Sequence, residues 1–156
     1  IGLRGLSYVC NAAYIYSRVR FEEGAPERDR PLAGQSPYLV NAGFFYQYDD
    51  KGISASLLYN RIGKRIESVG VPMQNQNEDI PDIYEMPRNS LDLTFSKKIG
   101  KIVEIKAGIQ DMLNSKVEYK QFVKLTDDKG GKSEREQLIR SYRPGVDINI
   151  GVSLRF

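Results

Sequence analysis

The strict alternation of apolar and polar residues at the C-terminal end constrains the fold of this chain more than any other feature. Over the last eleven residues, every second position is apolar: Val146, Ile148, Ile150, Val152, Leu154 and Phe156. Successive side chains of a β-strand point to opposite faces, whereas those of an α-helix repeat about every 3.6 residues. The segment is therefore predicted to be a strand with one apolar and one polar face.

The same period of two recurs in other parts of the chain. Residues 91–96 and 103–110 alternate regularly, and residues 40–48 and 53–60 do so with interruptions. The stretch 6–21 also predicts a strand, but it carries two competing apolar sets, so its faces stay unassigned. Helical periodicity is weak throughout. The best helix candidate, 133–139, is short and charged and is better interpreted as a solvated loop. The sequence thus predicts an all-β fold of about six strands.

The connections between these strands alternate in length. Residues 49–52 and 98–101 form tight, glycine-containing turns of the kind that join hairpins. Roughly 22–37, 71–88 and 124–142 are long, polar connections that hold most of the prolines. In an up-and-down antiparallel sheet, successive connections lie at opposite ends, so the short turns share one rim and the long loops the other. This arrangement is typical of an outer-membrane β-barrel.

Periodicity alone does not distinguish a soluble sandwich from a membrane barrel, because both have one apolar face. Strand length favours the barrel, since the third and fifth predicted strands extend over about 53–69 and 102–122, longer than strands usually are in globular sheets. Only part of each is apolar on one face, as expected for a bilayer-crossing band of about 9–11 residues. Tyr46, Tyr48 and Phe156 fall at the short-turn rim, where an interfacial aromatic girdle would lie. We therefore expect an antiparallel, up-and-down transmembrane β-barrel segment that ends at Phe156.

The residue counts exclude several kinds of active site. The chain has no histidine and one cysteine, Cys10, so it cannot form a Cys/His zinc site, a Ser-His-Asp triad, a Cys-His dyad or an internal disulfide. No apolar run approaches the roughly 18 residues of a membrane-spanning helix. A net charge of +3 does not indicate nucleic-acid binding, and no pair among the 20 acidic residues is marked out for catalysis. We expect no enzymatic activity, no cofactor and no metal site.

Several segments carry a family resemblance. The last eleven residues look like the final strand of outer-membrane barrels, whose terminal aromatic residue is read by the barrel-assembly machinery. Phe156 matches that aromatic residue, with Val152 and Leu154 as its alternating partners. Four further segments, 30–38, 54–66, 88–93 and 108–114, are similar in order to the late barrel segments of TonB-dependent outer-membrane receptors. Together these segments carry the resemblance through nearly the whole chain.

Receptors of this family have a barrel of about 22 strands that encloses an N-terminal plug domain, and they import iron-siderophores, cobalamin or glycans with energy delivered by TonB. The resemblance implies that residues 1–156 are a C-terminal part of such a barrel in the bacterial outer membrane. The plug, the TonB-contacting segment and the earlier strands are not found in this sequence. The implied partners are outer-membrane lipid, the protein's own plug and remaining strands, the TonB complex through parts not found here, and the assembly machinery.

In the barrel interpretation, six polar or charged side chains point into the lumen: Asp92, Glu104, Lys106, Asp147, Asn149 and Arg155. These side chains would be hydrated or would meet the plug. The long loops are stronger candidates for ligand contact, because they face the exterior. Two other interpretations stay open. One is a self-contained small β-barrel that binds an apolar ligand or a protein, and the other is a barrel client bound to assembly or secretion machinery.

Overall fold

The structure, a computed structural model, describes residues 5–22, 29–71, 80–126 and 132–155 of the chain. Its regular structure consists of ten β-strands and a one-turn 3-10 helix at Asp49–Lys51. The strands are β1 (Leu6–Tyr14), β2 (Tyr38–Tyr48), β3 (Ile53–Ile62), β4 (Arg65–Ser68), β5 (Ile83–Glu85), β6 (Arg88–Ile99), β7 (Val103–Gln110), β8 (Val117–Thr126), β9 (Lys132–Tyr142) and β10 (Asp147–Leu154). The all-β prediction is therefore confirmed.

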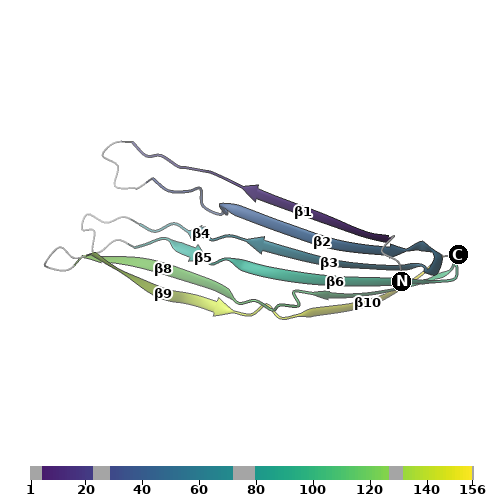
Figure 1. Cartoon of the computed structure of the whole chain (residues 1–156). Helices are drawn as coiled ribbons and strands as arrows, with labels where there is room; N and C mark the ends of the chain where they lie inside the picture. Colours follow the sequence, from purple (N-terminus) through teal and green to yellow (C-terminus); the bar gives the residue numbers. More distant parts are fainter. Residues whose placement is uncertain (1–4, 23–28, 72–79, 127–131, 156) are drawn as a thin grey trace.

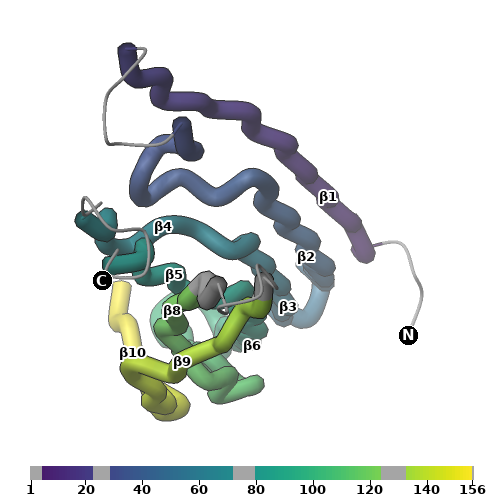
Figure 2. The backbone as a smooth tube through the Cα atoms, turned by 90° about the vertical axis from the view of Figure 1, so that its left-hand side faces the viewer, coloured from purple at the N-terminus to yellow at the C-terminus, as the bar shows by residue number. Residues whose placement is uncertain are grey.

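The strands form two antiparallel sheets that follow one another along the length of the molecule (Figure 1). The larger sheet has six strands in the order β1-β2-β3-β6-β7-β10, and the smaller has four in the order β4-β5-β8-β9. All eight strand pairings within these sheets are antiparallel, as expected. Seen end-on in Figure 2, the larger sheet follows a curved path from β1 to β10.

The predicted number of about six strands is corrected to ten. Two of the expected long strands, 53–69 and 102–122, are each divided in two, the first into β3 and β4 and the second into β7 and β8, whereas β5 and β9 lie in segments predicted to be long connections. Each division separates a strand of one sheet from a strand of the other. Among the described residues neither sheet closes on itself, and β1 and β10 each pair with one neighbour only. The structure is thus a curved, open sheet rather than a closed barrel.

The breaks fall at residues that interrupt a strand for local reasons. Gly63 separates β3 from β4, and a Cβ atom at this position would lie 2.7 Å from a ring carbon of Tyr38. Pro87 stands between β5 and β6 and has no N–H to donate to a ladder. Gly145, between β9 and β10, has a φ of +98°, a backbone angle that residues other than glycine rarely adopt. These residues mark where the larger sheet gives way to the smaller one.

Both predicted tight turns are present, at the same end of the larger sheet. The first contains Gly52 with a φ of +57°, and the second contains Gly100 with a φ of +62°. Since β2 and β3 are joined by one turn and β6 and β7 by the other, the short connections share one rim, as predicted. The four-stranded sheet lies at the opposite end of the molecule (Figure 1).

The long connections contain more strand than the sequence predicts. Most of 124–142 belongs to β8 and β9, so the interpretation of 133–139 as a solvated loop is wrong. Residues 133–139 show no apolar face, because charged or polar side chains lie on both sides of this part of β9. The hairpin is held instead by ten backbone pairings and by cross-strand ion pairs such as Lys120–Glu136, at 2.6 Å. The connection 71–88 likewise contains β5.

Few side chains are buried. The buried apolar side chains belong to the smaller sheet. Among the described residues, only Ile66, Val117 and Tyr119 are buried hydrophobic side chains. They come from β4 and β8, and Ser36 is the one buried polar residue in the part of the chain that the structure describes. The larger sheet contains none of these apolar side chains, so it has no core of its own.

Candidate functional site

The six-stranded sheet sorts its side chains onto two chemically different faces. Residues that lie directly opposite each other in an antiparallel ladder point to the same side. The observed register therefore places two sets of residues on the same side of the sheet, here called the apolar face. They are the even-numbered residues of β1, β2 and β10 and the odd-numbered residues of β3, β6 and β7. One row across this face reads Tyr8, Phe44, Leu57, Leu93, Ile109 and Ile148. The pairing also settles the open question of β1, whose Tyr8, Ala12 and Tyr14 lie on the apolar face and whose Val9 and Ala13 lie on the other.

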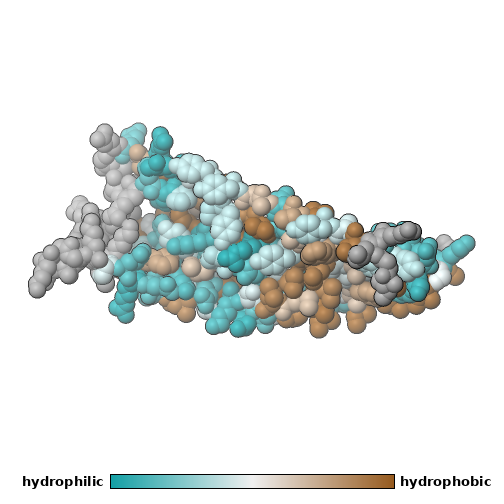
Figure 3. Space-filling model, in the orientation of Figure 1, coloured by the Kyte–Doolittle hydropathy of each residue, from teal (hydrophilic) through white to brown (hydrophobic). Residues whose placement is uncertain are grey.

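The apolar face is uncovered in the structure. Figure 3 shows hydrophobic side chains gathered over the end of the molecule that holds the larger sheet, and hydrophilic ones toward the smaller sheet. Exposure is highest on β10, at 68%, 76%, 63% and 56% for Ile148, Ile150, Val152 and Leu154. Inner strands are also open, since Phe44 on β2 is 49% exposed and Phe95 on β6 is 44% exposed. A contiguous exposed apolar surface of this kind is typical of a site that another protein or a membrane covers.

Tyrosines mark both ends of the apolar face. Tyr46 and Tyr48 lie on it beside the first short turn, as predicted. At the opposite end, Tyr14 of β1 pairs with Tyr38 of β2, and the Tyr14 side chain is 82% exposed. Amphipathic aromatic residues at both borders of an apolar band are typical of the two membrane–water interfaces. The second tyrosine pair was not predicted, because the faces of β1 could not be assigned from the sequence.

The other side of the sheet, here called the polar face, is linked by side-chain hydrogen bonds between neighbouring strands. The hydroxyl groups of Ser54 and Ser96 lie 2.7 Å apart. The hydroxyl groups of Ser56 and Thr94 lie 2.5 Å apart. The amide of Asn60 donates to the amide oxygen of Asn41. Neutral, self-paired groups of this kind are compatible with water on this side of the sheet.

All six residues predicted to face a lumen lie on the polar face: Asp92, Glu104, Lys106, Asp147, Asn149 and Arg155. Three of them gather near the short-turn rim. The Lys106 ammonium is 3.5 Å from the Glu104 carboxylate, and the Arg155 guanidinium is 3.9 Å from it. Glu104 is largely covered, whereas Arg155 is open to solvent, so this group has the character of a loose surface ion cluster.

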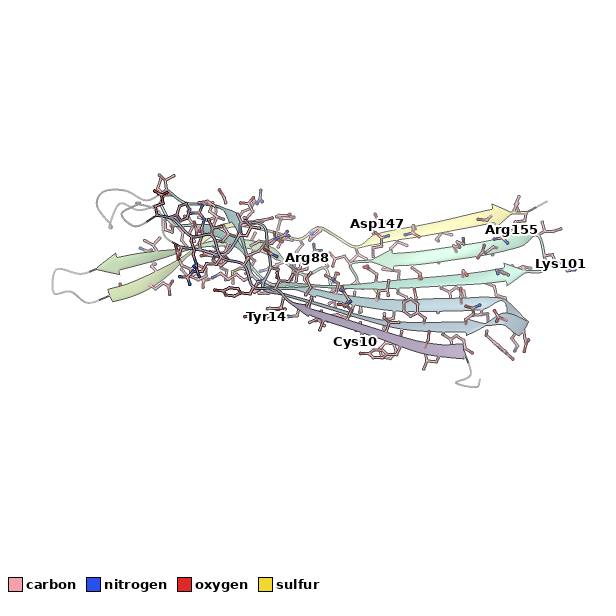
Figure 4. The ribbon with its side chains drawn as sticks, turned by 90° about the horizontal axis from the view of Figure 1, so that it is seen from above. Cys10, Tyr14, Arg88, Lys101, Asp147 and Arg155 are labelled. Atoms are coloured by element: carbon pink, nitrogen blue, oxygen red, sulfur yellow. The ribbon has the colours of Figure 1, made fainter. Side chains whose placement is uncertain are left out.

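The remaining three predicted residues are not brought into this cluster. Asp147 lies opposite Gln110, at the other end of β7, and Figure 4 shows it well away from Arg155 along β10. The amide of Asn149 covers Gly108, where a Cβ atom would lie 2.7 Å from the Asn149 amide oxygen. Asp92 accepts a hydrogen bond from the backbone N–H of Asp111 at 2.8 Å. The six residues therefore share a face but do not form one site.

A hollow of about 260 Å³ lies on the polar face between β1 and β6. Three apolar side chains, Val9, Phe45 and Leu58, line it around Gly43, where a Cβ atom would lie 2.8 Å from the Phe45 ring. Its polar lining comes from three amides and one carboxylate: Asn11, Asn41, Asn60 and Asp92. The hollow was not predicted, because it depends on the register of four strands.

A polar network at the junction of the two sheets was also missed. Asp111 has a φ of +52° and Asn114 a φ of +43°, and these two residues end β7 and turn the chain toward β8. The Asp111 carboxylate forms an ion pair with Arg88, at the start of β6, and Asn114 accepts a hydrogen bond from Gly145 N–H at 3.1 Å. Figure 4 shows Arg88 at this junction. Asp and Asn tolerate positive φ better than most residues, which is the one signal that could have indicated the bend.

The four-stranded sheet carries stacked cations and aromatic rings. The Lys64 ammonium lies 4.0 Å from the Tyr84 ring centre and 3.8 Å from that of Phe122. Burial lowers the pKa of Lys64, an effect opposed by the nearby carboxylates of Glu134 and Glu136. Burial also raises the pKa of Tyr84. This cluster fixes the turn after β3 against β5 and β8, and it has the character of a structural contact.

Two residues of the predicted assembly signal, Val152 and Leu154, lie on the apolar face of β10. Phe156, the third residue of that signal, lies outside the described residues. Cys10 is exposed on the apolar face of the edge strand β1, as Figure 4 also shows.

Two further properties concern the described part of the chain. It contains no group of three or more acidic or sulfur-bearing side chains placed to hold a metal ion. It also contains no helix whose length and hydropathy would suit it to crossing a bilayer. Comparison of the sequence with protein-family models and curated proteins, and of the structure with solved structures, finds no match.

Proposed function

We propose that this chain forms part of the wall of a TonB-dependent outer-membrane receptor that takes up a bulky ligand such as an iron-siderophore, cobalamin or a glycan. The observation that carries the proposal is the continuous, uncovered apolar face across six antiparallel strands. In this proposal the apolar face contacts lipid, and the polar face lines the lumen.

The height of the apolar face supports a bilayer as its environment. β2 has 11 residues, with Tyr38 and Tyr48 at its two ends. At about 3.3 Å per residue, its length is roughly 33 Å. A strand tilt of about 40° reduces this to a height of about 25 Å, which is the height of the apolar band of outer-membrane barrels. The tyrosines then lie at both interfaces.

The open edges support a larger assembly. On the described residues, β1 and β10 each leave one side of their backbone without a strand partner. Exposed strand edges bind further strands readily, and a barrel removes them by closure. In the proposed receptor, further strands of the same protein pair with these edges, and a plug domain meets the polar face.

The alternative of a self-contained binding module has one supporting observation, the hollow lined by Val9, Phe45 and Leu58. Such a module would have to cover the apolar face with a second layer. The described residues supply none, since both sheets follow one another instead of packing face to face. The receptor proposal therefore explains more of the structure.

The proposal is tested in the source bacterium with the gene for the native protein that contains this chain. We expect the protein in the outer-membrane fraction, resistant to extraction with alkaline carbonate. Deletion of the gene should abolish growth on one ligand of a panel of iron-siderophores, cobalamin and glycans, and deletion of the TonB gene should have the same effect. Recovery of the native protein in the soluble fraction would refute membrane insertion. Growth that depends on this gene but not on TonB would refute the transport mechanism.

A further inference from the structure

The apolar face ends at the short-turn rim in a lysine whose position is unusual. Lys97 of β6 lies opposite Ile53 on one side and Ile105 on the other, so its side chain belongs to the apolar face. It is half-buried, and its ammonium group donates to the backbone carbonyl of Lys51 in the turn. The aliphatic part thus lies along apolar neighbours while the charge reaches the rim, which is the snorkelling arrangement of lysines at membrane interfaces.

The charged side chains of the first short turn contact residues of different faces, Lys51 on the apolar face and Asp49 on the polar face. The Lys51 ammonium lies 5.8 Å from the centre of the Tyr48 ring, and Tyr48 belongs to the apolar face. The Asp49 carboxylate instead accepts a hydrogen bond of 2.7 Å from the side chain of Gln47, a residue of the polar face. The ammonium groups of Lys51 and Lys97 therefore both stand on the apolar side of this rim.

Below the two ammonium groups, toward the middle of the sheet, the surface is apolar. Ile53, Ile99 and Ile105 surround Lys97 on this face, and Ile99 is 52% exposed. A lysine ammonium has three donors, so Lys97 keeps two after its bond to the carbonyl. The rim thus combines free cationic donors with an apolar surface directly beside them, which is the chemical complement of an anionic amphiphile.

We propose that Lys51 and Lys97 bind the phosphate headgroup of an anionic phospholipid, such as phosphatidylglycerol, whose acyl chains lie against the isoleucines of the apolar face. This inference rests on the proposed membrane function, and it adds a lipid class and a location in the leaflet that faces the short turns. Charge complementarity favours an anionic headgroup over a zwitterionic one, since the amine of the latter would meet the lysines.

The experiment uses the native protein that contains this chain, purified in a neutral detergent. Native mass spectrometry measures binding of phosphatidylglycerol, of phosphatidylcholine with the same acyl chains, and of glycerol 3-phosphate. The variants are Lys51→Gln, Lys97→Gln and the double variant. Lys98→Gln is the matched control, because Lys98 is the next residue of β6, carries the same charge and points to the polar face.

We expect phosphatidylglycerol to bind more tightly than phosphatidylcholine or glycerol 3-phosphate. Each single substitution should weaken it about fivefold and the double substitution roughly 30-fold. Lys98→Gln should leave the affinity unchanged. Equal affinities for the two lipids, or a double variant that binds phosphatidylglycerol as the parent does, would overturn the proposal. Binding of glycerol 3-phosphate as tight as that of the lipid would also overturn it, in favour of a phosphate site.

A parallel assay separates this inference from the proposed function. The same samples are added to phosphatidylcholine vesicles, and their insertion is measured by flotation and circular dichroism. Insertion without any preference for phosphatidylglycerol refutes the headgroup site and leaves the membrane function standing. Failure to insert into these vesicles refutes both.

Discussion

An arginine in place of Leu93 is the most informative perturbation of the apolar face. Leu93 lies in the row that includes Phe44, between Leu57 on β3 and Ile109 on β7. On β6 itself, Leu93 is four residues from Asn89 and four from Lys97, the polar residues that border it on this face. With about 3.3 Å per residue and a tilt of about 40°, each of them differs from Leu93 by about 10 Å in height. Leu93 is therefore near the middle of the proposed bilayer.

The expected cost follows from this depth. An arginine on the lipid side of a barrel costs about 2–4 kcal/mol at the bilayer midplane and about 0–1 kcal/mol near the interface. Leu93→Arg should therefore reduce the ratio of folded to unfolded protein by a factor of about 30 to 900. Ile99→Arg, at the rim of the same strand and the same face, should cost less than about 1 kcal/mol. Thr94→Arg, next to Leu93 but on the polar face, should also be mild, with a loss of its hydroxyl contact to Ser56.

The assay is chemical unfolding of the native protein in phosphatidylcholine vesicles, followed by circular dichroism, which reports the loss of β-structure directly. The three variants differ in face and depth but introduce the same residue into the same strand. The lipid-contact interpretation predicts that only Leu93→Arg is severe. A cost at Ile99 equal to that at Leu93, or a cost at Thr94 as large as either, would refute the reasoning.

Two further predictions concern the junction and the smaller sheet. Arg88→Met should destabilise the protein by about 1–3 kcal/mol, because it leaves the largely covered carboxylate of Asp111 without its ion partner. Chemical unfolding measures this loss, and Arg155→Met, an exposed arginine, should change stability by less than about 0.5 kcal/mol. Burial raises the pKa of Tyr84 above its usual 10.0, so the stability linked to this residue is full below pH 10 and is lost as the pH rises through the higher folded value. We expect the free energy of unfolding to fall less in Tyr84→Phe than in the parent when both are measured from pH 8 to pH 11. An equal fall in parent and variant would contradict the assignment.

The larger sheet was predictable from sequence where one face is apolar and the other polar. β7 and β10 alternate regularly, and the observed register keeps their apolar positions on one side. The faces of β1 could not be predicted, because its polar-face residue Val9 is itself apolar and lines the hollow. Only the pairing of Tyr8 with Phe44 assigns them.

The smaller sheet and the junction were not predictable for a physical reason. Period-two patterns arise when one face of a strand is apolar, and β9 carries charge on both sides, so its sequence looks like a loop. The ion pair of Arg88 with Asp111 joins residues 23 positions apart, which no local pattern reveals. The shared face of the predicted lumen residues followed from alternation, but their distances along the sheet depend on register.

The central claim, that the apolar face meets lipid, is tested most directly with the chain's own cysteine. Cys10 lies opposite Ala42 on the apolar face, and the next residue, Asn11, lies opposite Asn41 on the polar face. An environment-sensitive fluorophore is attached to Cys10, or to Asn11→Cys combined with Cys10→Ser, in the native protein with any other cysteine outside this chain replaced by serine. In phosphatidylcholine vesicles, the label at Cys10 should be quenched by nitroxide lipids and protected from aqueous iodide, and the label at position 11 should show the reverse. Equal quenching of both labels by iodide, with none by nitroxide lipids, would contradict the account.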